Sequence, residues 1–241
     1  MLLPDFIIPS LVNQHLDYSG MDTIERCEDQ KHFNSYPHAI KYDYNSRGFR
    51  DAEWPDSVEE LQKCLWCIGD SATVGIGSPI NHTWPKILED RTGIRTIVVA
   101  LEGGSNDWIS RRSITVLKEI KPQHLVIHWS FSHRREDPNT SLSDEDRRHR
   151  FIDASWNENT KNMLDCILNV ESNSNDTQVI HSFIPDFIDK NGKKLFNATL
   201  DKRVKYKIPE FKKIDFARDA HHYANITATK FVDQIIKQII I

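Results

Sequence analysis

The chain has 241 residues, of which 39% are hydrophobic and 27% are charged, and its formal net charge is −4. These values are ordinary for a soluble globular protein, and they give no sign of a nucleic-acid partner. The length suffices for one well-buried core, so we expect a single main domain with additions to it.

No stretch of the sequence approaches the roughly 20 apolar residues that a transmembrane helix needs. The most apolar candidate, residues 1–12, is interrupted by Pro4, Asp5 and Pro9, and it lacks the basic start and the cleavage site of a signal peptide. We therefore expect no membrane span and, by default, a cytoplasmic protein. A protein carried on a virion or released by cell lysis would have the same features.

Residues 1–60 are rich in Asp, Asn, Tyr and Pro and have little periodicity. We expect them to form an extension of loops and short strands that wraps around a main domain of residues 61–241. Arg47 and Arg50 in this extension allow two interpretations, contact with an anionic substrate or a structural salt bridge, and the second is favoured.

From Cys64 onward, short apolar runs alternate with amphipathic stretches, which is typical of βαβ units around a parallel sheet. Each run is rich in Val and Ile and is bounded by polar or glycine-containing turns. The predicted strands are Cys64–Ile68, Thr96–Leu101, His124–Trp129 and Gln178–Phe183.

Helices are predicted between and after these strands. One should start at Ser105-Asn106-Asp107, whose short polar side chains can cap free N–H groups, and a second should run through Met163 and Ile167. The last helix is expected from apolar residues at three- and four-residue spacing between Val232 and Ile240. The run of charged residues at 144–150 favours a solvated helix face. Residues 184–214 have a weak, lysine-rich pattern that favours a hairpin or a long loop.

Two cysteines form a CxxC pattern, Cys64 and Cys67. A redox or zinc site would need a second pair or a helix start after the first cysteine, whereas this segment has the pattern of a buried strand. We therefore expect two core thiols. The histidines do not combine with carboxylates at a metal-binding spacing, so no metal is expected.

The segment Gly69-Asp70-Ser71 ends a predicted strand with an exposed serine, at the edge where open α/β sheets bind their ligands. A serine hydroxyl needs an imidazole to accept its proton and a carboxylate to orient that imidazole. Asp219 and His222, three residues apart and just before the last helix, have the required spacing. His221 is the less suitable neighbour. We predict Ser71 as nucleophile, His222 as base and Asp219 as its partner.

These two segments resemble the first and last motifs of the SGNH (GDSL-like) hydrolase family, and the resemblance extends over about residues 64–241. In that family a glycine turn and a later asparagine help to bind the oxyanion. By position the glycine is Gly103, with Gly104 as the alternative, and the N–H of Ser71 is a second donor. The asparagine is absent, and Ser130 stands nearest its place, as a donor or as a structural residue. Asn106, although followed by Asp107, comes too early and is assigned to helix capping.

The resemblance implies a three-layer α/β/α sandwich with a mostly parallel, flavodoxin-like sheet, and ester hydrolysis through an acyl-enzyme without a cofactor. The expected substrate is a small-molecule or carbohydrate ester with a short acyl group, O-acetyl sugars being favoured because three tryptophans could face a sugar or fill the core. These are Trp108, Trp129 and Trp156. The alternatives are a noncatalytic carbohydrate-binding or structural protein, and an acyltransferase with the same triad.

Overall fold

A five-stranded sheet forms the centre of the computed structural model, which describes residue 3 and residues 6–136, 154–184, 200, 202–208 and 212–239. The strand order is β4-β3-β5-β6-β7, and every neighbouring pair is parallel. This is the flavodoxin-like order, in which the chain reverses its direction of winding beside the first strand. The strands are β3 (Leu65–Gly69), β4 (Thr96–Ala100), β5 (His124–Trp129), β6 (Gln178–Phe183) and β7 (Tyr206–Lys207).

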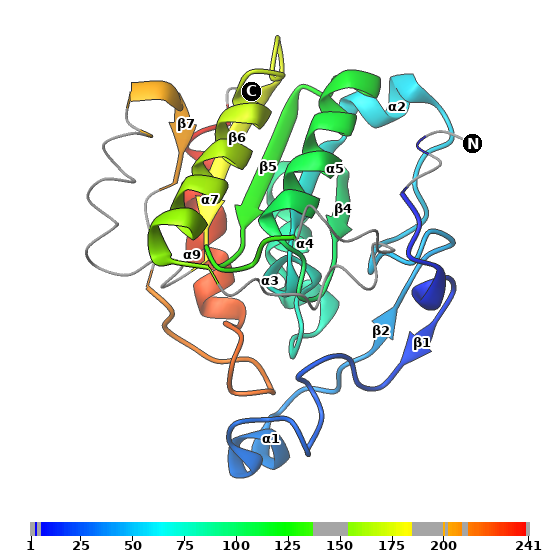
Figure 1. Ribbon diagram of the computed structural model, residues 1–241. Coiled ribbons are helices and arrows are strands. Elements are labelled where there is room, and N and C mark those ends of the chain that lie inside the picture. Colours follow the sequence, from blue (N-terminus) through cyan, green and yellow to red (C-terminus); the bar gives the residue numbers. More distant parts are fainter. Residues whose placement is uncertain are drawn as a thin grey trace.

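Helices cover both faces of the sheet and complete the expected three layers (Figure 1). On one face α5 (Asn106–Glu119) packs against α7 (Trp156–Glu171), and on the other α4 (Trp84–Thr92) packs against α9 (Asn225–Ile236). The shorter elements are η1 (Pro9–Leu11), β1 (His15–Leu16), α1 (Gln30–Ser35), β2 (Tyr42–Asp43), α2 (Val58–Lys63), α3 (Ser71–Val74) and η2 (Ile80–His82).

The helix starts follow from local side-chain chemistry. Ser105 caps α5, as predicted, because its Oγ accepts the N–H of Trp108 at 3.0 Å. Ser155 and Glu158 form a reciprocal capping box at the start of α7. The last helix is confirmed with a shorter extent than predicted, since α9 ends at Ile236. Ile240 and the charge run at 144–150 lie outside the described residues.

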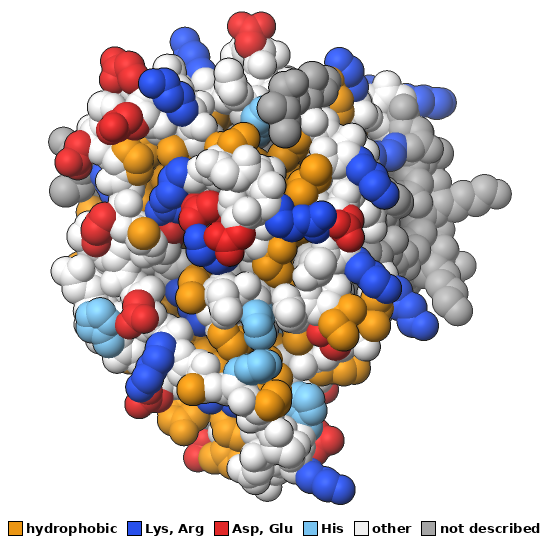
Figure 2. Space-filling view, turned by 180° about the vertical axis from the view of Figure 1, so that it is seen from behind, with side chains coloured by type: hydrophobic (Ala, Val, Ile, Leu, Met, Phe, Trp, Pro, Cys, Tyr) orange, Lys and Arg blue, Asp and Glu red, His pale blue; other side chains and the backbone are white. Residues whose placement is uncertain are grey.

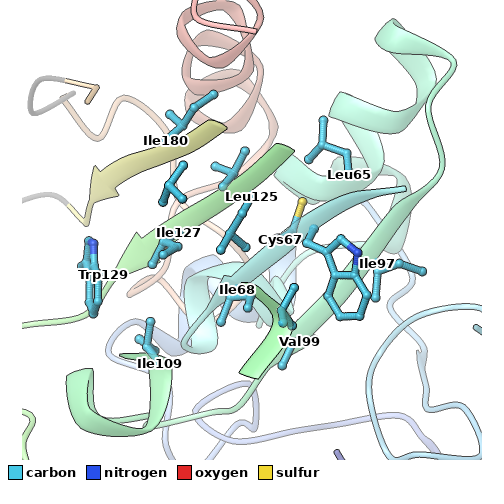
Figure 3. Close-up of a cluster of buried hydrophobic side chains, with 14 of the residues drawn as sticks. Leu65, Cys67, Ile68, Ile97, Val99, Ile109, Leu125, Ile127, Trp129 and Ile180 are labelled. Atoms are coloured by element: carbon cyan, nitrogen blue, oxygen red, sulfur yellow. The ribbon is translucent and has the colours of Figure 1, made fainter. Parts of the chain in front are cut away.

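The core lies between the sheet and the two helical layers. β3, β4 and β5 are buried along their whole length, since helices cover both of their faces. Figure 3 shows side chains such as Cys67, Ile127 and Ile180 in this core, on neighbouring strands. Cys64 and Cys67 are buried thiols, as predicted, and burial raises the pKa of both. Low nucleophilicity follows from that shift.

Two sequence predictions left alternatives open, and the structure bears on both. Residues 206–207 form the edge strand β7, which pairs in parallel with β6, whereas a hairpin would have paired antiparallel. Trp108 and Trp129 are 2% and 0% exposed, so they fill the core and face no substrate. Trp156 is partly buried and also packs on the core. The tryptophans therefore give no reason to prefer a sugar.

Residues 6–60 lie along one side of the sheet and extend past the carboxyl ends of its strands (Figure 1). β1 pairs antiparallel with β2 in a small sheet of its own. Acidic and basic side chains are interspersed over much of the face in Figure 2, in keeping with the small net charge. In the part of the chain that the structure describes, no helix is long and apolar enough to cross a membrane.

Candidate active site

Ser71 is the first residue of α3 and is separated from the end of β3 by Asp70 alone. Asp70 caps this helix, because its Oδ1 accepts a backbone N–H of the first turn at 3.0 Å. Gly69 has to lack a side chain, since a Cβ there would lie 2.8 Å from the His128 carbonyl oxygen. Ser71 is thus held at the carboxyl edge of the sheet, beside the point where the winding direction reverses.

The three residues predicted as a triad form one hydrogen-bonded chain. His222 Nε2 lies 2.8 Å from Ser71 Oγ, and His222 Nδ1 lies 2.5 Å from Asp219 Oδ2. A carboxylate only accepts hydrogen bonds, so Nδ1 carries the proton and Nε2 accepts the Ser71 hydroxyl. The fold brings these groups together although 151 positions separate Ser71 from His222.

The segment from Asp219 to His222 is a tight loop and not a helical turn. Asp219 Oδ1 accepts the backbone N–H groups of His221 and His222, both at 3.0 Å. Ala220 lies in the left-handed region with φ +58°. The carboxylate therefore both closes the loop and orients the imidazole that follows it.

Opposing effects set the pKa of Asp219, which is fully buried. Burial raises the pKa of this carboxyl, but the hydrogen bond and charge of His222, together with the N–H groups of His222 and His221, outweigh burial and leave the pKa below its usual value. The carboxylate is therefore ionised at neutral pH, in the state that accepts a proton-bearing imidazole nitrogen.

Ser71 and His222 open onto a cavity of 140 Å³. Its wall combines apolar groups with charged ones. The lining residues are Asp70, Ser71, Ala72, Phe131, Arg134, Ile184, Lys213, His221, His222 and Tyr223. Gly103, Asp219 and Ser130 are not among the described lining residues. A space of this size accommodates a small acyl group.

A larger cavity of 300 Å³ lies over the β4 side of the sheet. Its charged side chains bind one another: Arg95 pairs with Asp51 at 2.8 Å and with Glu89 at 3.3 Å, and Lys86 pairs with Glu89 at 2.7 Å. Its described lining includes no serine, cysteine or histidine. The smaller cavity is therefore the better candidate for catalysis.

The glycine turn that follows β4 has the backbone that the sequence analysis required. Gly103 has φ +68°, which favours glycine. The N–H of Gly104 is engaged, because it donates to the Leu101 carbonyl oxygen at 2.9 Å. Within the described residues neither the N–H of Gly103 nor the N–H of Ser71 donates to a protein acceptor.

Ser130 follows β5 and lies behind the nucleophile rather than on the cavity wall. Its Oγ donates to Asp70 Oδ2 at 2.6 Å and accepts from Arg134 Nη1 at 3.2 Å. Arg134 also pairs with Asp70 at 2.9 Å. This network was not predicted from the sequence; the signal for it is an arginine four residues after the serine that follows a strand.

The Asn106 side chain forms hydrogen bonds with the loop after β5 and does not cap α5. Its Oδ1 accepts the N–H of Ser130 at 3.0 Å, and its Nδ2 donates to the Phe131 carbonyl oxygen at 3.0 Å. Asp107 accepts the N–H of Glu136 at 2.9 Å. The side chains of Asn106 and Asp107 were predicted to cap α5, but their polar atoms bind the loop after β5. Ser105 is the residue whose side chain caps the helix.

A residue of the N-terminal extension binds the end of α3, the helix that begins at Ser71. Arg50 is buried, and its guanidinium donates to the carbonyl oxygens of Val74 at 3.2 Å and Gly75 at 2.7 Å, at the end of α3. It also binds the Lys41 and Ser78 carbonyl oxygens. The salt bridge that was favoured from sequence is not formed by Arg50 within the described residues. Its two Nη groups bind backbone carbonyl oxygens instead, whereas its buried Nε has no hydrogen-bond partner among the described residues.

The same extension holds the loop that carries Asp219. Asp22 is fully buried and binds Arg218 through two hydrogen bonds of 2.6 and 2.7 Å. Tyr42 donates to Asp22 at 2.5 Å and accepts the N–H of Gly77 at 2.8 Å. The loops that follow Ser71 and precede His222 are therefore joined through Asp22 and Tyr42.

No protein-family model and no curated protein sequence matches this chain, whereas solved structures do. TesA superimposes with a TM-score of 0.53 at 14% identity, over 73% of this chain and 97% of that chain. A structure from Desulfitobacterium hafniense assigned to the G-D-S-L family of lipolytic proteins gives 0.50 at 14% identity, over 73% and 99%.

A family two carbohydrate esterase from Clostridium thermocellum, solved in complex with cellohexaose, has a TM-score of 0.50 at 13% identity, over 74% of this chain and 63% of that chain. At such identities the likeness concerns the fold alone. It confirms the expected architecture, a three-layer α/β/α sandwich of the SGNH hydrolase type.

Proposed function

We propose that this chain, which has the fold of the SGNH hydrolases, is a serine esterase that acts on short acyl esters. The observation that carries the proposal is the hydrogen-bonded chain from Asp219 through His222 to Ser71, which ends at a cavity. Its distances are those of a nucleophile, a general base and an orienting carboxylate.

In the first half of the reaction His222 Nε2 accepts the Ser71 proton while Oγ attacks the acyl carbonyl carbon. The carbonyl oxygen becomes an oxyanion, and the N–H groups of Ser71 and Gly103 are the proposed donors to it. The imidazolium then gives its proton to the departing alkoxide. This step releases the alcohol and leaves the acyl group on Ser71.

In the second half a water molecule takes the place of the alcohol. His222 accepts a proton from the water, the resulting hydroxide attacks the acyl carbon, and the same proton returns to Ser71 Oγ as the acid leaves. Throughout, Asp219 keeps the Nδ1 proton of His222 in place and stabilises the imidazolium. It does so without becoming protonated.

The size of the cavity limits the acyl group. A volume of 140 Å³ favours acetyl or butyryl over a long fatty chain. O-acetylated carbohydrate is the natural substrate class that we propose, and a carbohydrate esterase with the same fold is a precedent. The alignment of the triad atoms argues against a noncatalytic binding protein, since a binding site has no need of it.

The test compares hydrolysis of p-nitrophenyl acetate, butyrate and octanoate by the wild type and by Ser71→Ala. We expect kcat/KM to fall by roughly 10³-fold or more in the variant, because the nucleophile is lost. Acetate and butyrate should be hydrolysed faster than octanoate. Ser172→Ala, which changes an exposed serine at the end of α7, is the matched control.

Equal, negligible rates in the wild type and in Ser71→Ala, with both proteins folded by circular dichroism, would contradict the esterase. Binding of acetylated and plain oligosaccharides would then test the noncatalytic alternative. If the wild type is active, adding a sugar alcohol as acceptor separates a hydrolase from an acyltransferase, because a transferase forms the acylated sugar at the expense of free acid.

A further inference from the structure

We propose that Lys213 binds a carboxylate on the substrate, so that the site prefers an acyl ester whose alcohol or acyl part carries a negative charge near the scissile bond. This inference rests on the proposed esterase function and specifies its substrate class. It is carried by the position of Lys213 on the cavity wall beside Ser71 and His222, and by its lack of a counter-ion in the described part of the chain.

The other ionic groups on the cavity wall have partners in the protein. Asp70 and Arg134 pair at 2.9 Å and neutralise each other. His221 Nδ1 lies 2.8 Å from Glu28 Oε1. Lys213 differs from them: over residues 6–136, 154–184, 202–208 and 212–239, no carboxylate forms an ion pair with it.

The ammonium group of Lys213 is held in place by its own surroundings. Nζ donates to the His221 carbonyl oxygen at 2.8 Å and lies 4.8 Å from the centre of the Phe216 ring. The carbonyl belongs to the peptide group that leads into His222, so the cation is fixed next to the catalytic loop. One of its three N–H groups is used, and the remaining two can bind a carboxylate.

A half-buried ammonium group without a counter-ion interacts with an anion more strongly than a fully solvated lysine does. The neighbouring Lys212 is exposed and is not among the lining residues of the cavity. The two lysines are adjacent in sequence but differ in their relation to the triad. They therefore provide a proposed ligand group and its matched control.

The experiment compares two acetate esters, 4-acetoxybenzoate, which carries a carboxylate, and its neutral methyl ester. We measure kcat/KM for both in the wild type, Lys213→Gln, Lys213→Arg and Lys212→Gln. We expect Lys213→Gln to lower the ratio of the charged to the neutral ester about tenfold, mainly through KM, as a charge-assisted hydrogen bond is lost. Lys213→Arg should retain most of the ratio, and Lys212→Gln should leave it unchanged. Intrinsic differences in reactivity cancel when variants are compared.

A binding measurement tests Lys213 independently of turnover. Calorimetric titration of 4-acetoxybenzoate into Ser71→Ala and into Ser71→Ala with Lys213→Gln should show about tenfold weaker binding in the double variant. It should also show weaker binding at high salt, because the interaction is electrostatic.

The outcomes separate the two proposals. The proposed role of Lys213 is wrong if the ratio of kcat/KM for the charged and the neutral ester is the same in the wild type and in Lys213→Gln. It is also wrong if the two Ser71→Ala proteins bind 4-acetoxybenzoate equally. In both cases the esterase stands. If the wild type hydrolyses neither ester but the calorimetric difference is present, the esterase is wrong and the anion site stands.

Discussion

The hydroxyl of Ser130 has a single proton, which Asp70 Oδ2 accepts at 2.6 Å. Ser130 is fully buried, and the N–H of its own backbone is held by Asn106. To donate to an oxyanion, this hydroxyl would have to leave a carboxylate that is only 1% exposed. The energetic cost of that exchange argues for a positioning role, with Ser130 keeping Asp70 in place beneath the nucleophile.

We therefore predict that Ser130→Ala lowers the free energy of unfolding by about 2 kcal/mol, the contribution of a hydrogen bond to a charged group. We expect kcat for p-nitrophenyl acetate to change by less than about tenfold. Urea unfolding and steady-state kinetics measure the two effects. Ser110→Ala, which loses a buried bond to the neutral Cys166 carbonyl, is the control. A fall in kcat of roughly 10² to 10³ would instead assign Ser130 to the oxyanion site.

At the residue scale, the sequence is most informative where chemistry restricts the choice of residue, and the roles of Ser71, Asp219 and His222 stay predictions although their side chains lie within hydrogen-bond distance. Ser71, Asp219 and His222 were predicted because few spacings allow a serine, an imidazole and a carboxylate to cooperate. Arg134 and Lys213 were not predicted as part of the site. Lys213 lies in a lysine-rich segment of weak periodicity, and nothing local distinguishes it from Lys212. Only the folded loop places one of them on the cavity wall.

Among the structural elements, the segment that leads into β2 joins three parts of the molecule. Asp22 binds Tyr42 of β2 and Arg218 of the loop before α9, and Tyr42 in turn binds Gly77 after α3. Arg218 also donates its backbone N–H to the Gly77 carbonyl oxygen at 2.8 Å. The buried ion pair therefore fixes the separation of the loop after α3 and the loop before α9.

We predict that Asp22→Asn lowers the free energy of unfolding by about 3 kcal/mol, because Arg218 keeps its charge at a site where only 12% of its side chain is exposed. The loss of loop geometry should lower kcat for p-nitrophenyl acetate more than it raises KM. Urea unfolding and kinetics provide the measurements. Asp43→Asn breaks an exposed pair with His15 and should change stability by about 0.5 kcal/mol or less. Equal effects of the two substitutions would contradict the prediction.

The elements differ in how well the sequence predicts them. The ends of β3, β4, β5 and β6 were predicted to within one residue. Strands that are buried on both faces consist of short runs of apolar residues, which are easy to recognise in a sequence. β7 has two residues and its pairing depends on β6, so it leaves no periodic signal. The contacts of the extension could not be predicted either, since Asp22 and Arg218 lie 196 positions apart.

For the whole molecule, stability in acid depends on a histidine buried between the sheet and the α9 layer. His128 is fully buried; its Nδ1 lies 3.0 Å from Ser182 Oγ and its Nε2 3.2 Å from the Tyr223 hydroxyl. Ser182 Oγ donates to the Ile127 carbonyl oxygen, so it accepts from Nδ1, and Nε2 accepts from Tyr223. Burial lowers the pKa of His128 to about 4.

Because the folded pKa lies below the unfolded value of 6.5, the unfolded chain binds the proton more readily. This group therefore contributes full stability above pH 6.5, and the contribution falls as the pH decreases toward 4. We predict a loss of roughly 2 kcal/mol from His128 between pH 7.5 and pH 5. Urea unfolding at both pH values should show that His128→Gln is less sensitive to acid than the wild type. Equal pH dependence in both proteins would contradict the prediction.

At the scale of the fold, the architecture followed from the alternation of strands and helices, and the resemblance of two motifs specified its type. The pattern could not reveal which aromatic residues face the site. Trp108 and Trp129 have amphipathic side chains, which can stack on a sugar or pack in a core. The packing of α5 and β5 buries both of them in the core. The cavity wall comes from loops, whose conformation depends on distant contacts.

The separation of Asp22 from Arg218 also has a consequence for biosynthesis. A ribosome adds about 5 to 20 residues per second, so the 196 positions between the two partners correspond to roughly 10 to 40 s of translation. During that interval the nucleophile turn can form on the nascent chain, but its imidazole and the arginine that holds the adjoining loop have not yet been made. The proposed triad is thus completed late, and a polypeptide interrupted before residue 222 would have Ser71 without His222.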